Sequence, residues 1–308
     1  MTARLLQPPS TLCMGAAGSG KTSALVTYIE AGLELFVIGT EPNCADSLLD
    51  ALERKRLPIE KLHWHQVTPV AQNWSAINAM LTTVNAMSYE DITKLKQGIG
   101  KTEQKAFKEF LDCVQNFKCD RDGKSYGDAT LWGDDRAFAI DSLSGMSYMS
   151  MANTVGLKPA IHQGEWGVAM NVIDQVLLKI TSDCKCFFTL NAHTEKEIDQ
   201  LGGGTKVMVS TLGAKLAPKI PKFFSEVVWA KKRLANPQFT WSTIDNDADL
   251  KNRALPNSAV LDPSYVQIVA VHRKRKLAMS GSPTVGAPPA SPTQASSSLL
   301  AQTQGPTA

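Results

Sequence analysis

An eight-residue stretch near the start of the chain constrains the fold more than any other feature. Residues 15–22 read GAAGSGKT and match the pattern G-x-x-x-x-G-K-[ST]. Glycine at these positions lets the backbone curl until successive N–H groups point at phosphate oxygens. Lys21 can then reach the β- and γ-phosphates, and the Thr22 hydroxyl can bind Mg²⁺. The stretch therefore predicts a phosphate-binding loop, the P-loop.

The flanking residues decide between a P-loop and an ordinary glycine-rich turn. Residues 11–14 form a short apolar run typical of a strand, and residues 23–29 continue with apolar residues at helical spacing. A P-loop needs this order of strand, loop and helix, because the positive end of the helix dipole then faces the anion. We therefore expect nucleotide binding by Gly15, Ala16, Ala17, Gly18, Ser19, Gly20, Lys21, Thr22 and Ser23.

Length, charge and cysteine content are those of a soluble globular protein. The 308 residues suffice for a large core in one or two domains, and a formal net charge of +3 does not by itself indicate a nucleic-acid partner. No CxxC pair occurs, and the histidines do not complete a zinc pattern. For Cys184 and Cys186 we favour buried free thiols over metal binding. No signal peptide or membrane-length apolar run is seen, so a cytoplasmic protein without membrane contact is expected.

Strand-type and helical patterns alternate along the chain. Strands are expected at residues 33–41, 62–67, 136–142, 185–193 and 226–230, and helices at 43–55, 70–87, 106–117 and 166–180. A proline-bounded helix at 211–224 and a strand pair at 239–244 and 265–271 complete the expected elements. The alternation predicts an α/β protein with a mostly parallel, helix-covered sheet.

Several segments depart from this alternation. Residues 1–10 are expected to form a loose arm, and residues about 88–132 an insertion whose charges form a solvated face, favoured over a DNA-binding surface. The core thus spans residues 1–279, and the uncharged Pro/Ser/Ala-rich residues 280–308 are predicted to be disordered. For the basic residues 272–276, a solvated exit from the last strand and a phosphate-contacting patch both stay open.

Two carboxylates at strand ends point to the chemistry of the site. Asp141 lies at the end of the apolar strand at 136–142. In P-loop enzymes, an aspartate at the end of such a strand holds Mg²⁺. Many P-loop enzymes carry a catalytic carboxylate directly after this aspartate. Here the next residue is Ser142, which is not acidic. Glu41, at the end of another strand, could orient water on the γ-phosphate instead. A helix-capping or surface glutamate is the alternative for Glu41.

The order of these features resembles the core of RecA-type recombinases. The matching pieces are, in chain order, residues 15–22, 36–41, 138–142, 164–167 with the helix after them, 187–193 and 212–216. Together they cover roughly residues 10–270. The sequence is most similar to the short, core-only RecA-like ATPases of bacteriophages, which are implicated in single-strand annealing and recombination.

This resemblance implies a RecA-like P-loop NTPase core that binds ATP and Mg²⁺ and assembles head to tail as a filament or ring on single-stranded DNA. Glu41 would be the catalytic carboxylate, and Asn191 or His193 would sense the γ-phosphate beside Lys21. Residues 143–165, interpreted as a mobile loop, and residues 195–212 would be the two DNA-facing loops.

Two further sets of residues follow from such an assembly. RecA-type enzymes complete the site with cations from the neighbouring subunit, because the transition state spreads negative charge over the γ-phosphoryl oxygens. The candidates by position are Lys251 and Arg253, followed by Lys231, Lys232 and Arg233. For single-stranded DNA the candidates are Lys206 on a phosphate and Met146, Tyr148 and Met149 against bases. Packing of these last residues against the neighbouring loop is the alternative.

We therefore predict a Mg²⁺-dependent ATPase that binds single-stranded DNA in phage-type recombination or strand annealing, with ATP hydrolysed at subunit interfaces. If the chain is phage-encoded, it would act in the cytoplasm of an infected bacterial host, and its tail could tether a single-strand DNA-binding protein. One alternative is a P-loop motor or helicase loader, against which the Asp141-Ser142 pair counts. Another is an ATP-gated scaffold that does not depend on catalysis.

Overall fold

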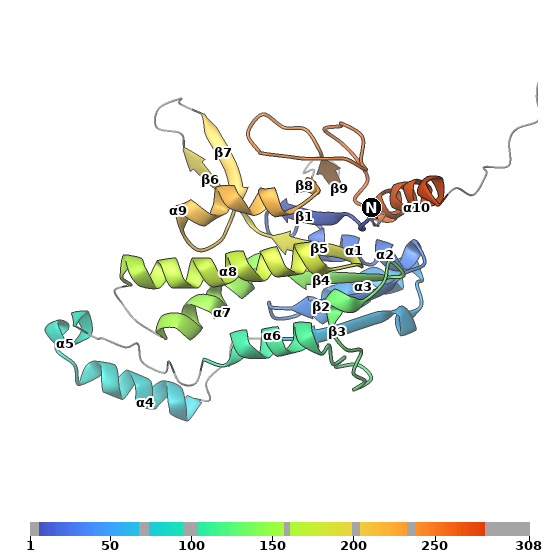
Figure 1. Ribbon diagram of the computed structural model, residues 1–308. Coiled ribbons are helices and arrows are strands. Elements are labelled where there is room, and N and C mark those ends of the chain that lie inside the picture. The colour runs from blue at the N-terminus through green and yellow to red at the C-terminus, as the bar shows by residue number, and fades with distance from the viewer. Residues whose placement is uncertain are drawn as a thin grey trace, which may run out of the picture.

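A seven-stranded sheet forms the centre of the molecule (Figure 1). The computed structural model describes residues 6–67, 74–94, 101, 104–156, 161–198, 204–232 and 238–280. The strand order is β3-β2-β4-β5-β1-β8-β9, and only β9 runs antiparallel to its neighbour. The strands are β1 (Ser10–Gly15), β2 (Glu34–Gly39), β3 (Leu62–Gln66), β4 (Arg136–Asp141), β5 (Phe187–Ala192), β8 (Glu226–Lys232) and β9 (Phe239–Ser242).

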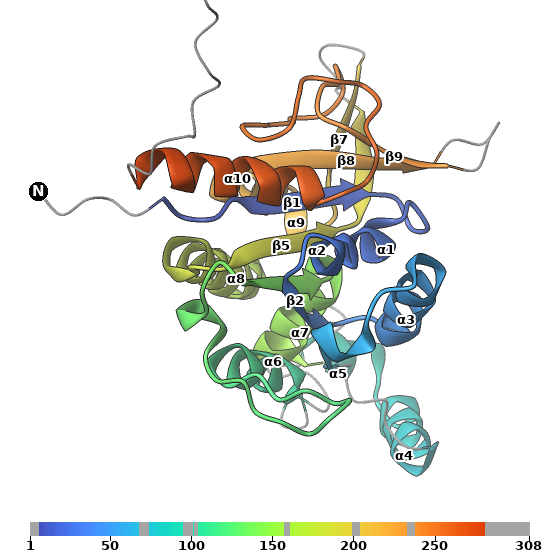
Figure 2. The same ribbon diagram turned by 90° about the vertical axis from the view of Figure 1, so that its right-hand side faces the viewer.

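The central strands are continuous apolar runs because helices cover both faces of the sheet (Figure 2). One face packs on α6 (Ala106–Gln115), α7 (Leu143–Val155) and α8 (Gln163–Asp183). The other packs on α1 (Lys21–Leu25), α2 (Thr27–Glu30), α3 (Cys44–Lys55) and α10 (Val266–Met279). Successive side chains of a strand point to opposite faces, so Phe187 joins the second core cluster and Phe188 the first.

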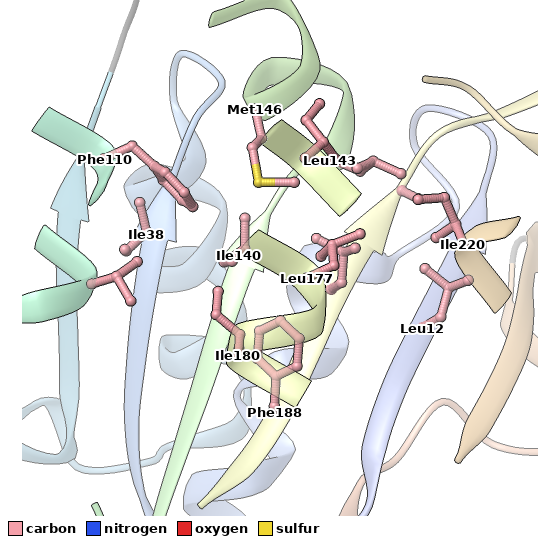
Figure 3. Packing of buried hydrophobic residues seen from close by; sticks show 14 of the residues in the cluster. Leu12, Ile38, Phe110, Ile140, Leu143, Met146, Leu177, Ile180, Phe188 and Ile220 are labelled. Atoms are coloured by element: carbon pink, nitrogen blue, oxygen red, sulfur yellow. The ribbon is translucent and has the colours of Figure 1, made fainter. Parts of the chain in front are cut away.

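Figure 3 shows how the first face is filled. Phe110 of α6, Met146 of α7 and Ile180 of α8 come down on the strand residues Ile140 and Phe188. All of these side chains are at most 1% exposed. Burial of a phenylalanine or isoleucine contributes about 1.5–3 kcal/mol, so this layer is a main source of stability.

The strand order places β5 between the P-loop strand β1 and the aspartate strand β4. The parallel register aligns Gly39, Asp141 and Asn191 across β2, β4 and β5. The carboxyl ends of these strands therefore meet at one edge of the sheet, the usual place for a ligand in such folds. The predicted fold class, an α/β RecA-like P-loop core with a mostly parallel helix-covered sheet, is confirmed.

The connection between β3 and β4 has two parts. Helices α4 (Trp74–Asn85) and α5 (Tyr89–Thr93) lie away from the sheet, at the lower left of Figure 1. In the rest of the connection, α6, η3 (Ala129–Leu131) and the residues between them pack on the sheet, with Phe110, Phe117 and Trp132 buried. Much of the segment interpreted as an insertion at 88–132 is therefore a layer of the core. Residues 95–100 and 102–103 lie outside the described residues.

Two expectations about local structure are wrong. Residues 143–155 of the segment 143–165 are not a mobile loop, because Leu143, Met146 and Met149 recur at helical spacing and are buried as one face of α7, while residues 157–160 lie outside the described residues. The segment 265–271 is not a strand: Ile268, Val269 and His272 are the buried face of α10. A short apolar run is compatible with both a strand and a helix, and the sequence alone does not show which surface it packs on.

The remaining expectations are met in part. The segment 195–212 contains the strands β6 (Thr194–Ile198) and β7 (Thr205–Val209), which pair as an antiparallel hairpin, and residues 199–203 lie outside the described residues. The prolines near residue 220 divide the expected helix into α9 (Gly213–Leu216) and the 3₁₀ helix η4 (Ala217–Phe223). A short 3₁₀ turn, η1 (Ile59–Lys61), precedes β3. Residues 1–5 of the predicted loose arm and the tail at 281–308 fall outside the described residues.

All six cysteines are buried and form no disulfide, as predicted for Cys184 and Cys186. Across the residues that the structure describes, none of the helices has both the length and the apolar character needed to cross a bilayer.

Candidate nucleotide-binding site

The P-loop connects β1 to α1 and keeps its lysine inside. Gly18 and Gly20 have φ angles of +69° and +83°, which L side chains rarely adopt. The Lys21 ammonium donates to the carbonyl oxygens of Gly15 at 2.8 Å and Ala16 at 2.9 Å. Burial lowers the pKa of Lys21 from its ordinary value. A phosphate oxygen in the loop would offer this ammonium a charged partner in place of two neutral carbonyls.

The Thr22 hydroxyl and the Asp141 carboxylate meet at the mouth of the loop. Thr22 Oγ1 donates to Asp141 Oδ2 at 2.6 Å. Asp141 is 5% exposed, and burial raises the pKa of its carboxyl while the hydrogen bond from Thr22 opposes the rise. Next to it on β5, the buried amide of Asn191 has no hydrogen-bond partner for either its nitrogen or its oxygen among the described residues. A hydroxyl, a carboxylate and an unpartnered amide are oxygen donors of the kind Mg²⁺ takes, so the residues fit that ion.

Glu41 lies beside this pair and is held by two side chains. Its Oε1 accepts a hydrogen bond from Ser142 Oγ and another from His193 Nε2, the latter at 2.9 Å. Because an ionised carboxylate only accepts, the proton of His193 lies on Nε2 in this contact. The hydrogen bond from His193 is the main cause that lowers the pKa of Glu41. The side chain stays 38% exposed, so the carboxylate is ionised and accessible.

A second set of contacts fixes the backbone that carries Glu41. The Thr40 hydroxyl accepts from the Ser142 N–H at 2.7 Å and donates to the Ser142 carbonyl at 2.9 Å. The peptide bond between Asp141 and Ser142 is cis. Gln66 donates to the carbonyl of Glu41 at 2.8 Å. The ends of β2, β3 and β4 therefore position Glu41 jointly.

The P-loop, Glu41, Asp141 and His193 line a cleft of about 250 Å³ that adjoins a second cleft of about 290 Å³. The two share Gly20, Ser23 and Phe239. The Phe239 ring packs directly on Gly20, where an added Cβ would lie 2.6 Å from the ring. The first cleft is lined by the P-loop and charged groups, and the second is mainly apolar. The pair matches a nucleotide with phosphates in the first cleft and a base beside Phe239. A larger hollow of about 650 Å³ between α6 and α8 contains none of these groups.

The fold thus brings together most of the predicted site residues. Lys21, Thr22, Asp141, Glu41 and His193 line one cleft, although the sequence separates the first and last by more than half the chain. The sequence analysis missed the parts that Thr40, Ser142 and Phe239 play. Thr40 and Ser142 flank predicted site residues, which was the available signal. Phe239 is an ordinary apolar residue in the sequence and gave none.

The cations predicted to act on a neighbouring subunit have varied surroundings. Lys231 pairs with Asp245 at 2.6 Å, and Lys251 donates to the Phe224 carbonyl at 2.6 Å. Lys232 and Arg253 are exposed, and Arg233 lies outside the described residues. Within the described part of the chain, Lys21 is the cation that lines the cleft.

The predicted DNA contacts need one correction. Met146 is 0% exposed and Met149 is 2% exposed, so neither can stack on a base; both belong to the core cluster beneath α7. Tyr148 points the other way and is 53% exposed. Lys206 on β7 is 48% exposed and pairs with Asp249 at 2.8 Å. Tyr148 and Lys206 stay predictions.

Comparisons with known proteins add little beyond this geometry. No protein-family model matches the sequence, and no curated protein is significantly similar to it. Among solved structures, the flagellar accessory protein FlaH from Methanocaldococcus jannaschii is similar with a TM-score of 0.36 and 11% identity, covering 83% of this chain and 90% of that chain. The class of the protein follows from its own fold and site, which are those of a RecA-like P-loop nucleotide-binding core.

The tight packing of Gly145 on Thr40 tests how Glu41 is positioned. A Cβ at Gly145 would lie 2.6 Å from the Thr40 carbonyl oxygen. We expect Gly145→Ala to lower the free energy of unfolding by about 1–3 kcal/mol, although alanine is the better helix former. The matched control is Gly167→Ala in α8, where nothing lies within 4 Å, and it should be neutral or stabilising. Urea unfolding measures both, and equal effects would contradict the packing argument.

Proposed function

We propose that this chain is an ATPase that binds single-stranded DNA in phage-type recombination or strand annealing and hydrolyses ATP between the subunits of a homo-oligomer. One observation carries the proposal. The two side chains that donate to the Glu41 carboxylate are Ser142, at the start of α7, and His193, at the start of the β6–β7 hairpin. The carboxylate that lines the cleft with Lys21 is thus hydrogen-bonded to the residues that precede the two segments, 143–165 and 195–212, which the family resemblance assigns to DNA.

Glu41 is suited to orient the attacking water. It is ionised and partly exposed, and its two donors fix its orientation from one side. A carboxylate within hydrogen-bond reach of water accepts its proton as the oxygen attacks phosphorus. Mg²⁺, when held by Thr22 and Asp141, would neutralise charge on the phosphate oxygens. The ammonium of Lys21 exchanges its loop carbonyls for phosphate oxygens as nucleotide binds.

The hairpin and α7 also contact one another. The Ser210 N–H donates to the His193 carbonyl at 2.7 Å and closes the base of the hairpin. Ser147 of α7 hydrogen-bonds Thr211 at 2.9 Å. Farther out, Ile198 is 73% exposed. The hairpin begins at the nucleotide site and carries exposed side chains, so it is suited to bind DNA in a way that depends on the nucleotide.

An oligomer supplies what the described part of one chain lacks. Charge that develops on the γ-phosphoryl group calls for more than one cation, and Lys21 is the one that lines the cleft here. Lys232 and Arg253 are exposed and suited to reach a neighbour's cleft. In this proposal the tail at 280–308 tethers a single-strand DNA-binding protein. The protein acts in the cytoplasm of a bacterial host.

The role of Glu41 is tested by Glu41→Gln. The amide keeps the size of the side chain but cannot take a proton, so we expect ATP turnover to fall by about 10²-fold or more. Titration with a fluorescent ATP analogue should show binding close to that of the unmodified chain. Lys21→Ala is the contrasting variant, which should lose binding. Unchanged turnover in Glu41→Gln would place the catalytic base elsewhere or indicate an ATP-gated scaffold.

The hydrogen bond from His193 predicts a pH effect. It holds the pKa of Glu41 below its ordinary value, so Glu41 stays ionised as the pH falls. In His193→Ala that pKa should rise, and the acidic limb of the turnover profile should move to higher pH. His193→Gln keeps a donor and should move the limb less. Identical profiles in all three proteins would show that the limb does not report Glu41.

DNA dependence separates the proposal from a motor or loader that acts on protein. We expect single-stranded DNA to stimulate ATP turnover and the effect to fade with salt, because phosphate contacts release counterions. Lys206→Ala should reduce the slope of log affinity against log salt by about 0.7, the value for one lost contact to a single strand. Lys108→Ala is the matched control, because this lysine is an exposed residue of α6, away from the hairpin. Turnover that ignores DNA, with no complex at low salt, would reject the DNA proposal.

A further inference from the structure

A tight turn docks on β3 far from the P-loop cleft. The turn spans residues 119–124, and the Gly123 N–H donates to the Cys119 carbonyl at 2.8 Å. Gly123 has a φ of +68°, which a glycine adopts without strain. The Asp120 N–H donates to the Trp64 carbonyl at 2.8 Å and fastens the turn to β3. Cys119 and Asp122 therefore belong to one turn, which is docked on β3.

Three metal-binding side chains converge at this junction. His63 of β3, Cys119 and Asp122 each offer one ligand atom, and these atoms lie within 4.8 Å of one another. His63 Nδ1 is 3.8 Å from Asp122 Oδ2. Cys119 is 0% exposed and His63 is 2% exposed. We call His63, Cys119 and Asp122 the β3-turn cluster.

The protonation state of His63 leaves a lone pair in the cluster. Arg121 Nη2 lies 3.5 Å from His63 Nδ1, and a guanidinium can only donate. Nδ1 is therefore the acceptor nitrogen, and the ring proton lies on Nε2, which has no hydrogen-bond partner among the described residues. Burial lowers the pKa of His63, so the ring is neutral. The hydrogen bond from the Lys124 N–H is the main cause that lowers the pKa of Asp122 to about 2, so this carboxylate is ionised.

We propose that the β3-turn cluster binds a Zn²⁺-type transition metal ion through His63 Nδ1, Cys119 Sγ and the Asp122 carboxylate, with solvent as fourth ligand. A nitrogen, a sulfur and an oxygen donor are the set that zinc takes in proteins. The Cys-x-x-Asp spacing is that of the Cys-x-x-Cys turn in structural zinc sites, with aspartate at the second position. Binding releases the thiol proton of Cys119 to solvent, since the thiolate is the ligand.

The geometry requires a modest closure around the ion. Tetrahedral zinc with bonds of about 2.0–2.3 Å places its ligand atoms about 3.3–3.8 Å apart, whereas the ligand atoms of the cluster lie within 4.8 Å of one another. The neighbouring Arg121 is the obstacle, because its Nη2 lies 3.5 Å from His63 Nδ1 and donates to Asp122 Oδ2 at 3.2 Å, and it must yield both ligand atoms to the ion. Its Nε donates to the Leu62 carbonyl at 3.1 Å, so it can turn its outer nitrogens to solvent without leaving β3. The thiolate and carboxylate together balance the ionic charge.

The function we assign to this ion is structural. It joins β3 to a turn 56 residues later in the chain, through His63 and Cys119. The sequence pattern concealed the site, because neither segment alone completes a zinc motif. None of its residues lines the P-loop cleft, so the test does not depend on ATP or DNA.

The experiment is a Co²⁺ titration of the full chain after chelator treatment, with elemental analysis of zinc in parallel. We expect one equivalent of Co²⁺, a thiolate-to-cobalt charge-transfer band, displacement by Zn²⁺ and a higher Tm with zinc. Cys119→Ser should abolish the band. Cys113→Ser, a buried cysteine of α6 outside the cluster, should keep it. Asp122→Asn should keep the fold and weaken binding by at least about tenfold.

The outcomes decide the proposal in either direction. It is overturned if the folded chain gives no charge-transfer band and binds no stoichiometric zinc, which would mean that hydrogen bonds alone hold the turn. It is also overturned if the band survives Cys119→Ser and is lost in Cys113→Ser. If Cys119→Ser does not fold, Asp122→Asn decides by its affinity, and unchanged affinity rejects the cluster as the site.

Discussion

The hydrogen bond from Thr22 to the Asp141 carboxylate joins the two halves of the site. Because β5 separates β1 from β4, no backbone ladder connects the P-loop strand to the aspartate strand. This side-chain contact of 2.6 Å is one of the links between them. Burying a carboxylate without a partner costs several kcal/mol, and the Thr22 hydroxyl offsets part of that cost. The same two oxygens suit a hard cation, so the contact that stabilises the loop also presents ligands to Mg²⁺.

Glu41 connects this centre to the surface. One of its oxygens accepts from Ser142 and from His193, and each donor begins an element that extends away from the cleft. A water or phosphate that competes for Glu41 therefore acts on α7 and the β6–β7 hairpin together. The side chain of Asn191, two residues before His193, is buried without a hydrogen-bond partner among the described residues and leaves a further polar group ready for a ligand. An orphaned buried amide costs about 1–3 kcal/mol, and a bound nucleotide complex is the state in which that cost can be recovered.

The sequence could predict what depends on local pattern. A P-loop, a strand-terminal aspartate and alternating buried runs each occupy a few consecutive residues, so the fold class and the positions of Lys21, Thr22, Asp141 and Glu41 were accessible. Features that depend on contacts between distant parts of the chain could not be predicted in this way. Met146 reads as a residue free to meet a base, and only the sheet beneath α7 shows that it is core. The docking of Phe239 on Gly20 joins positions far apart in the sequence, and no spacing rule links them.

The charge around the cleft also argues for a second subunit. In the described residues, Lys21 faces two carboxylates, Asp141 and Glu41, so the first cleft carries net negative charge before any nucleotide enters. A triphosphate brings several more negative charges into a partly buried site, where they are screened less than in water. A divalent ion offsets two of these negative charges, and the remaining ones stay unbalanced. Exposed basic side chains of a neighbouring copy, such as Lys232 and Arg253, would balance the remainder at the open side of the cleft. This arrangement would make hydrolysis depend on assembly, since the charge of the transition state is then balanced only where two subunits meet.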